Sequence, residues 1–315
     1  MKIILYYIAT AATAITLFSS CGCSKLPIDS PVAFSSPNRP ADTVVFAVIG
    51  DYGTDSKAEA DVAAMVKSWQ PEFVITTGDN NYPVGSSGSI VKNIGKHYCD
   101  FIYNPDAPSD RQCKGPAAEE KINRFFPCPG NHDNYSVPAL RPYTDYFTLP
   151  GDERNYDFIW GTIHFFSLNT GVSGKLDERT IQWLQQKLKS GTARFKIVYF
   201  HHPPYSSGGH GSNEAMQLPF GEWGADAVLC GHDHFYERIL DKNSPKPVYF
   251  IIGNSGNENL YSCNSKPLDT TRFTYNCDDK NYGAVKVKAG KNSCTFEYYT
   301  TANPSAPADV WVIVK

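Results

Sequence analysis

Apolar residues occur along the chain in short runs, with longer segments of helical spacing between them. The run Val44–Ile49 is continuously apolar and predicts a buried strand. Ser56–Trp69 follows, with apolar residues three and four positions apart, which predicts one face of a helix. Phe73–Thr77 repeats the strand signal. Strand, helix and strand in this order indicate an α/β unit.

The same alternation continues further along the chain and then changes. Ile163–Leu168 and Ile197–Phe200 predict two more strands, and Leu176–Leu188 between them has helical spacing. The last third of the chain contains more strand signals than helical ones, which predicts a second sheet. Its strands are expected at Ala227–Cys230, Val248–Ile252, Ala284–Val287, Cys294–Tyr299 and Val310–Val314.

Two long segments between these elements are rich in Gly, Ser, Asn, Asp and Pro. They run from Pro83 to Pro116 and from Asn254 to Tyr282. Loops of this length usually carry function. The chain has 315 residues and a hydrophobic fraction of 41%, and it has no repeat of fixed period, so we predict one large catalytic domain over residues 42–315.

The amino terminus has the layout of an export signal. Lys2 is followed by the mostly apolar run Ile3–Phe18, which is shorter than the about 20 apolar residues that a membrane span needs. We therefore predict an export signal over residues 1–20 and a Pro- and Ser-rich tether over residues 21–41. Ser19-Ser20-Cys21 resembles a bacterial lipoprotein processing site. The expected product is a periplasmic or cell-surface lipoprotein anchored at Cys21, or a secreted protein.

Charge and cysteine content restrict the partners. The formal net charge is -3 and no Lys/Arg-rich stripe is present, which argues against a nucleic-acid partner. The oligomeric state is left open. Nine cysteines in an exported chain permit disulfides. The pairs that bracket polar loops of suitable length are Cys99 with Cys113 and Cys263 with Cys277.

Five short polar blocks each follow an apolar run. Because open α/β sheets build their sites at the carboxyl ends of strands, we expect these blocks to meet at one edge. One block alone is a weak signal, since it can be a turn or a polar loop. Together they supply the carboxylates, amide and imidazoles of a dinuclear hydrolytic site. The candidate metal ligands are Asp51, Asp79, Tyr82, Asn131, His201, His232 and His234.

The blocks resemble those of the metallophosphoesterase (calcineurin-like) superfamily. Tyr82, within Gly78-Asp79-Asn80-Asn81-Tyr82, makes the chain similar to the purple acid phosphatases in particular, over most of residues 44–256. Larger plant-type members have an extra amino-terminal β-domain, whereas here only the tether precedes Asp51, as in the short form. The resemblance implies a four-layer α/β/β/α sandwich of two mixed sheets.

The resemblance also implies how the ligands divide between two metal ions. Fe(III) would be held by Asp51, Asp79, Tyr82 and His234, and a divalent ion, Fe, Zn or Mn, by Asp79, Asn131, His201 and His232. The chemistry agrees, because phenolate and carboxylate are hard anionic donors that suit Fe(III), and a neutral amide and imidazoles suit a softer divalent ion. Tyr82 must lose its proton on binding.

The implied reaction is hydrolysis of phosphate monoesters of small molecules, with in-line attack by a metal-bound hydroxide. His132 and His210 resemble the family's catalytic histidines. They are expected to bind substrate phosphate and protonate the leaving group, which favours mildly acidic activity. For His210 alone the alternative is an exposed loop histidine. For the whole protein the alternatives are a phosphodiesterase or nucleotide pyrophosphatase with the same site and, less favoured because no ligand is missing, a non-catalytic surface lipoprotein.

Four nearby polar residues receive no ligand role. Asp133 is expected to orient His132 or to bind the surrounding backbone, and His202 is expected to cover the site. His97 and His164 are predicted to be structural.

Overall fold

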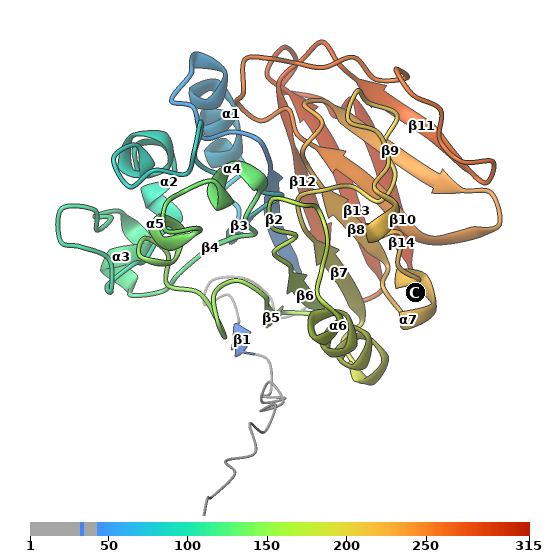
Figure 1. The fold of residues 1–315 in the computed structure, drawn as a ribbon, viewed down its shortest axis with the longest axis horizontal. Coiled ribbons are helices and arrows are strands. Elements are labelled where there is room, and N and C mark those ends of the chain that lie inside the picture. Colours follow the sequence, from blue (N-terminus) through green and yellow to red (C-terminus); the bar gives the residue numbers. More distant parts are fainter. Residues whose placement is uncertain (1–31, 35–42) are drawn as a thin grey trace, which may run out of the picture. The chain divides into compact units, whose positions relative to one another are not determined.

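The computed structural model describes residues 32–34 and 43–315, which form two mixed β-sheets with helices against them (Figure 1). Sheet A has the order β1-β5-β6-β7-β8-β10-β9-β11, and sheet B has the order β14-β13-β12-β2-β3-β4. The strands of sheet A are β1 (Val32–Phe34), β5 (Tyr156–Trp160), β6 (Ile163–Ser167), β7 (Phe195–Tyr199), β8 (Ala227–Cys230), β10 (Ser244–Ile252), β9 (Tyr236–Asp241) and β11 (Arg272–Asp278). Those of sheet B are β14 (Asp309–Val314), β13 (Ser293–Thr300), β12 (Gly283–Ala289), β2 (Val44–Ile49), β3 (Phe73–Thr76) and β4 (Phe125–Pro127).

The two longest helices begin at side chains that cap them. Ser56 Oγ accepts a hydrogen bond from the backbone N–H of Glu59, and Asp177 accepts one from Thr180, so amide groups at both helix starts are satisfied. The helices are α1 (Lys57–Ser68), α2 (Lys96–Tyr98), α3 (Pro116–Glu120), α4 (Asn131–Asn134), α5 (Arg141–Thr144), α6 (Glu178–Ser190) and α7 (Phe220–Trp223), with a π-helix η1 (Val91–Gly95) and 3-10 helices η2 (Cys99–Phe101) and η3 (Glu214–Met216).

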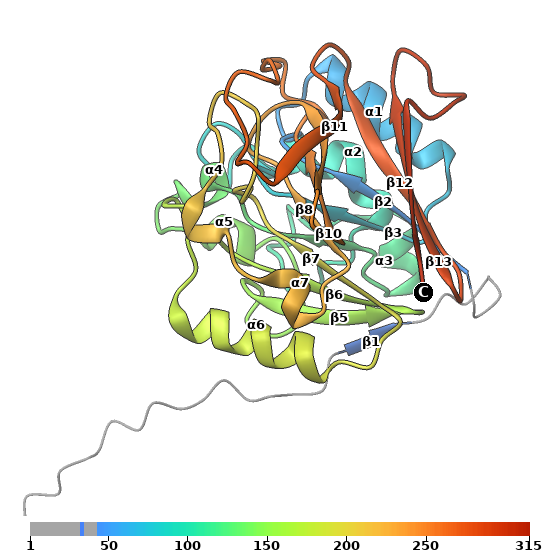
Figure 2. The ribbon, with the colours of Figure 1, turned by 90° about the vertical axis from the view of Figure 1, so that its right-hand side faces the viewer.

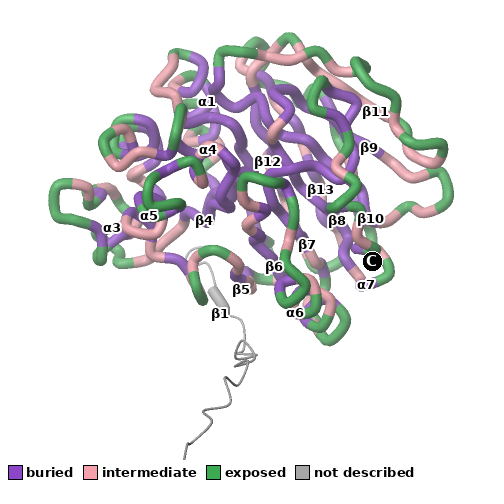
Figure 3. The backbone as a smooth tube through the Cα atoms, viewed as in Figure 1, coloured by how far each residue is buried: buried purple, intermediate pink, exposed green. Residues whose placement is uncertain are grey.

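Two apolar clusters hold the layers together. Between the sheets, Phe46 of β2 and Phe73 of β3 pack edge-on against Phe165 of β6, with ring centroids 5.2 and 5.4 Å away. On the outer face of sheet A, Leu184 of α6 and Phe220 of α7 belong to a second cluster. Helix α1 packs on the other side, against sheet B (Figure 2). Most strands are largely buried, whereas β11 and β14 are not, and the other exposed residues lie mainly in loops and helices (Figure 3). The predicted four-layer sandwich is confirmed.

The order of the strands gathers the polar blocks. Strands β2, β3 and β4 are mutually parallel neighbours, and so are β6, β7 and β8. Their carboxyl ends therefore point the same way within each sheet. The five blocks follow β2, β3, β4, β7 and β8.

Several elements differ from the prediction. Val32–Phe34, inside the predicted tether, forms β1, which pairs with β5. The predicted insertion from Asn254 to Tyr282 contains β11, and the one from Pro83 to Pro116 contains η1, α2 and η2. Strand β9 was missed because its Glu237 and Arg238 are charged although they are buried. The predicted export signal and Cys21 lie outside the described residues. Within the described part, no helix has the length and apolar character needed to cross a membrane.

Both expected disulfides are present. Cys99 is bonded to Cys113, and Cys263 to Cys277. Each bond closes a loop of one of the two long insertions, which reduces the freedom of the unfolded chain at that point. Cys128 and Cys230 are free and buried, as small packing residues would be.

A buried ion pair joins β9 of sheet A to β14, an edge strand of sheet B. Arg238 of β9 donates from Nε and Nη2 to the two carboxylate oxygens of Asp309 of β14, at 2.7 and 2.8 Å. Tyr236 donates to the same carboxylate at 2.7 Å. The guanidinium also lies 4.0 Å from the ring centroid of Tyr275 and 4.7 Å from that of Trp311. Removing one charge would leave the other buried without a partner.

We expect Asp309→Asn to lower the free energy of unfolding by about 3 kcal/mol, because Arg238 would remain buried and charged. Asp61→Asn is the control, since Asp61 pairs with Lys57 through side chains that are 47% and 84% exposed, and its loss should cost less than about 1 kcal/mol. Urea unfolding followed by circular dichroism measures both. Equal effects of the two substitutions would contradict the role given to Arg238.

Candidate metal centre

Three of the predicted ligands have an unusual backbone. Asp51, Asp79 and His232 have φ angles of 52°, 52° and 74°, in the left-handed region that residues with side chains seldom adopt. Each follows a glycine just beyond the end of a strand. Strained conformations of this kind persist where the surrounding structure fixes them, and they concentrate at functional sites.

The phenol of Tyr82 is the centre of one group of donor atoms. Its Oη lies 3.0 Å from Asp79 Oδ2, 3.2 Å from Asp51 Oδ1 and 3.2 Å from His234 Nε2. His234 Nε2 and Asp51 Oδ1 are 3.4 Å apart. Four side chains from three separate blocks thus present oxygen and nitrogen atoms to one point.

His201 is the centre of a second group. Its Nε2 lies 2.9 Å from Asn131 Oδ1, 3.1 Å from His232 Nδ1 and 3.3 Å from Asp79 Oδ2. Asp79 Oδ2 therefore belongs to both groups, as a bridging ligand would. Donor atoms of Asp51, Asp79 and His201 all lie within 4.8 Å of one another. The structure brings together all seven residues expected from the sequence.

The hydrogen bonds of the histidines show that the donor set fits metal ions. His201 Nδ1 lies 2.9 Å from the carbonyl oxygen of Thr77, and His234 Nδ1 lies 2.7 Å from that of Asn259. Because a carbonyl only accepts, each Nδ1 carries a proton and each Nε2 offers a lone pair. Those lone pairs face oxygen atoms of the site. A cation placed between these nitrogen and oxygen atoms would be bound by both.

The pKa shifts of the buried groups also bear on metal binding. Burial raises the pKa of Tyr82 well above its ordinary value, and Asp79 and Asp51 raise it further. Burial also raises the pKa of Asp51. For His201 burial acts in the opposite direction, but the two carboxylates outweigh it and raise the pKa to about 9. A metal that binds here must therefore displace tightly held protons from His201 Nε2 and from the Tyr82 phenol.

Backbone groups hold both carboxylates in place. The N–H of His132 donates to Asp79 Oδ1 at 2.9 Å, which leaves Oδ2 facing the two donor groups. The N–H of His232 donates to Asp51 Oδ2 at 3.0 Å. The same N–H also lies 3.2 Å from Asp51 Oδ1, so the backbone holds Asp51 through both oxygens and Asp79 through Oδ1.

Asp133 and His202 are not ligands, but their hydrogen bonds hold the segments that carry the ligands. Asp133 Oδ2 accepts from the backbone N–H groups of Gly130 and Asn80, at 2.8 and 3.1 Å, so of the two expected roles it fills the backbone one. His202 is buried, and its Nδ1 lies 2.8 Å from Thr170 Oγ1. Burial lowers the pKa of His202 to about 3, which keeps its ring neutral.

The two predicted catalytic histidines lie beside the donor groups. His132 Nδ1 donates to the carbonyl of Pro83 at 2.5 Å, and its Nε2 lies 3.9 Å from Asp79 Oδ2. Its side chain is 31% exposed, so it can meet a ligand in solution. The ring of His210 is exposed and lies 4.2 Å from the ring of His232. His97 and His164 instead bond Asp55 and Asp157, at 3.0 and 2.7 Å, as structural residues.

Residues that the sequence did not single out complete the site from the second insertion. Tyr261 stacks on His234 with ring centroids 4.2 Å apart and planes 11° apart, and its backbone N–H donates to the His234 carbonyl at 3.1 Å. Asn257 forms a side-chain hydrogen bond with Tyr82. The composition of this insertion indicated a functional loop, and the segment that ends at Asn257 resembles the family, but neither residue was given a role at the metal centre.

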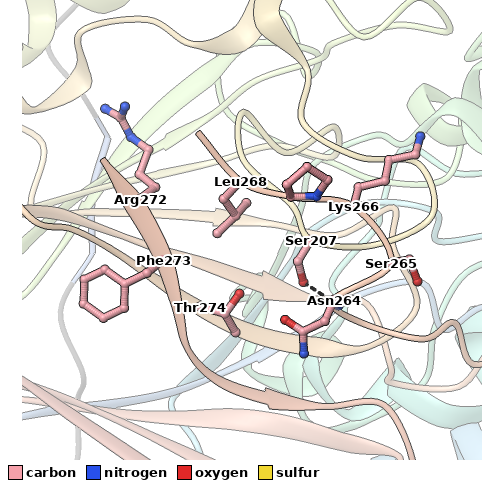
Figure 4. A pocket seen from close by; sticks show the side chains of 9 residues that line it. Ser207, Asn264, Ser265, Lys266, Leu268, Arg272, Phe273 and Thr274 are labelled. Atoms are coloured by element: carbon pink, nitrogen blue, oxygen red, sulfur yellow. Dashed lines mark hydrogen bonds between the residues drawn. The ribbon is translucent and has the colours of Figure 1, made fainter. Parts of the chain in front are cut away.

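A cavity of about 500 Å³ lies behind the loop that carries His210 (Figure 4). Ser207 Oγ accepts from the backbone N–H of Asn264 at 2.9 Å, and Lys266 Nζ donates to the His210 carbonyl at 3.3 Å. Arg272, which also lines the cavity, pairs with two carboxylates. The metal ligands do not line this cavity, so it is separate from the centre.

Strand-end carboxylates and imidazoles around a shared aspartate define a metal-dependent hydrolase of the α/β class. Residues 44–236 match the family model of calcineurin-like phosphoesterases, which is more than half of the chain, and the protein belongs to this family. It is therefore a phosphoesterase with a metal centre.

Within this family, the similar proteins include purple acid phosphatases. Purple acid phosphatase 17 of Arabidopsis thaliana is 26% identical over 71% of this chain and 72% of its own length. Tartrate-resistant acid phosphatase type 5 of Homo sapiens is 27% identical over 82% of this chain and 88% of its own. A purple acid phosphatase structure from yellow lupin shares the fold, with a TM-score of 0.65 and 16% identity over 88% of this chain and 55% of that one. The predicted resemblance to purple acid phosphatases is confirmed.

We expect Gly130→Ala to lower metal affinity by about tenfold or more. A Cβ at Gly130 would lie 2.1 Å from Asp79 Oδ1 and 2.3 Å from its backbone nitrogen, so Asp79 would have to move. Gly88→Ala is the control, because a Cβ there meets nothing within 4 Å. Metal content by mass spectrometry after dialysis, with circular dichroism to verify folding, tests this. Full metal retention in a folded Gly130→Ala protein would refute it.

Proposed function

We propose that the protein is an acid phosphatase that hydrolyses phosphate monoesters with a centre of Fe(III) and a divalent ion, Fe, Zn or Mn. The observation that carries this proposal is the position of Tyr82 Oη, 3.0 Å from Asp79 and 3.2 Å from both Asp51 and His234. A phenolate among carboxylates suits a hard trivalent ion. The group around His201, with a neutral amide and two imidazoles, suits a divalent one.

The metal pair, when bound, supplies a water of lowered pKa and positive charge for the phosphoryl oxygens. The protein's own side chains supply the rest. Asp79 holds both halves of the centre at a fixed separation, because its Oδ2 contacts Tyr82 on one side and His201 on the other. This fixed geometry is the positioning that phosphoryl transfer requires.

His132 and His210 are proposed to bind the substrate phosphate and to donate the proton that the leaving alkoxide takes up. His132 is suited to this because its Nδ1 is held by the Pro83 carbonyl, so Nε2 is directed outward beside Asp79. His210 lies on the opposite group, against His232. The substrate phosphate would then sit between the two histidines.

We also propose that the protein is exported, as a lipoprotein anchored at Cys21 or as a secreted enzyme. The two disulfides support this, because such bonds persist in oxidising compartments. Detection of a lipid or of a cleaved amino terminus by mass spectrometry of the purified protein distinguishes the two forms.

We expect the metal-loaded protein to be coloured, because a tyrosinate bound to Fe(III) gives a charge-transfer absorption, and Tyr82→Phe should remove the visible band. Tyr135→Phe is the control, since Tyr135 contacts Asn131 through its hydroxyl but is not a proposed ligand. Visible spectra and iron analysis of the three proteins test whether Tyr82 binds Fe(III). An active, colourless protein containing Mn or Zn would favour the phosphodiesterase alternative.

We expect Asp79→Asn to lower turnover of p-nitrophenyl phosphate by about 100-fold, because the bridging charge is lost. Asp61→Asn, on the exposed face of α1, should leave turnover unchanged. Wild-type turnover of bis(p-nitrophenyl) phosphate is measured in parallel. Unchanged activity of Asp79→Asn would show that the proposed bridge is irrelevant, and faster diester than monoester hydrolysis would identify a phosphodiesterase.

A further inference from the structure

A second cavity, of about 470 Å³, lies between the loop that follows β6 and the start of α6. Its lining is mostly polar and combines two cations and two carboxylates with side-chain amides and hydroxyls. The residues on which the argument rests are Arg154, Asn155, Asn169, Thr170 and Lys175. Such a lining suits a strongly polar ligand rather than an apolar one.

The two cations of this cavity are available to a ligand. Arg154 and Lys175 are exposed, and among the described residues no carboxylate lies within ion-pair distance of either. The two acids at the rim are held by backbone groups: Asp152 accepts from the N–H groups of Arg154 and Asn155, at 3.0 and 2.8 Å, and Asp177 caps α6. The larger cavity in Figure 4 differs, because its Arg272 is paired with Asp241 and Asp269.

The cavity adjoins the metal centre through side-chain contacts. Thr170 Oγ1, on its wall, lies 2.8 Å from His202 Nδ1, and the His202 ring lies 4.4 Å from that of the proposed ligand His232. Asn169 Oδ1 accepts from Asn134 Nδ2 at 3.0 Å, three residues beyond the ligand Asn131.

Topology places the cavity and the ligands at the same edge. The loop of Asn169 and Thr170 follows β6, which is the parallel neighbour of β7, and β7 is followed by His201. The loop after β8, the next parallel strand, carries His232. The cavity and the ligand-bearing loops therefore lie at the same edge of sheet A.

We propose that this cavity binds a second phosphate of the substrate, so that preferred substrates are small bisphosphates from which the centre removes one phosphate. The inference rests on the proposed phosphatase activity and names its substrate class. Arg154 supplies the planar donor pair that matches phosphate oxygens, and Lys175 supplies a second positive charge. Asn155, whose Oδ1 accepts from the backbone N–H of Asn169 at 2.9 Å, offers its Nδ2 group beside them.

The test compares fructose bisphosphate with p-nitrophenyl phosphate, which has no second phosphate. We expect the wild-type enzyme to have the lower KM for the bisphosphate. In the double variant Arg154→Gln, Lys175→Gln that KM should rise by about tenfold or more, since two charge-assisted contacts are lost, while p-nitrophenyl phosphate kinetics change by less than about twofold. Arg154→Lys keeps the positive charge but loses the planar donor pair, so it should raise the KM for the bisphosphate by less than the double variant does.

Lys291→Gln is the matched control. Lys291 is an exposed cation in the turn after β12, whose last residue Ala289 pairs with Val44 at the start of β2, so this turn lies at the end of sheet B away from the metal centre. Its loss of one charge is compared with that of the single variant Lys175→Gln, and it should leave both KM values unchanged. An equal change in Lys291→Gln would show that net charge alone is responsible, and would overturn the inference.

Two further outcomes would also overturn it: no preference for the bisphosphate in the wild type, or the same change for both substrates in the double variant. Binding of an unreactive bisphosphonate is measured by calorimetry as well. If neither substrate is hydrolysed, the proposed function fails, and the subsite is judged by binding alone. Weaker bisphosphonate binding in the double variant then supports it, and equal binding refutes it.

Discussion

Asp79 is the residue on which the rest of the site depends. Its Oδ2 lies 3.0 Å from the Tyr82 phenol and 3.3 Å from His201 Nε2, so a single buried oxygen belongs to both donor groups. A buried carboxylate surrounded by other acceptors is costly unless positive charge is present. The protein can hold this arrangement only because every surrounding element restricts it.

Backbone geometry supplies that restriction. Asp79 and Asp51 adopt left-handed conformations, and each carboxylate is bound by a backbone N–H. Glycines allow the strand ends to approach: a Cβ at Gly130 would lie 2.1 Å from Asp79 Oδ1, and one at Gly231 would lie 2.4 Å from Asp51 Oδ2. Closely packed aromatic residues fill the space between the sheets. The strand ends therefore cannot move apart to relieve the strain at the cluster. Strain and buried charge are thus stabilised by packing elsewhere in the fold.

The same physics explains which parts could be predicted from sequence. The ligands were found because each follows a continuous apolar strand, and such runs are strong signals when both faces of a strand are buried. Strand β9 was missed because Arg238 and Glu237 are satisfied by partners distant in sequence, Asp309 and Thr274. Local patterns contain no information about such partners. For the same reason Tyr261 was not recognised, since its stacking on His234 depends on how a long loop folds back.

The insertion from Asn254 to Tyr282 shows that strand ends and loops contribute differently to the metal centre. Asn264 and Lys266 donate from their backbone N–H groups to the side chain and the carbonyl of Ser207, both at 2.9 Å, and Cys263 is tied to Cys277. The loop that carries His210 is therefore held by a second loop and, through the Ser207 N–H, by the Glu237 side chain of β9 at 3.1 Å. Metal ligands need positions fixed by strand ends, whereas groups that meet substrate can be altered by changing loops without disturbing the buried carboxylates. Substrate choice in this fold is accordingly a property of the loops, and the chemistry a property of the strand ends.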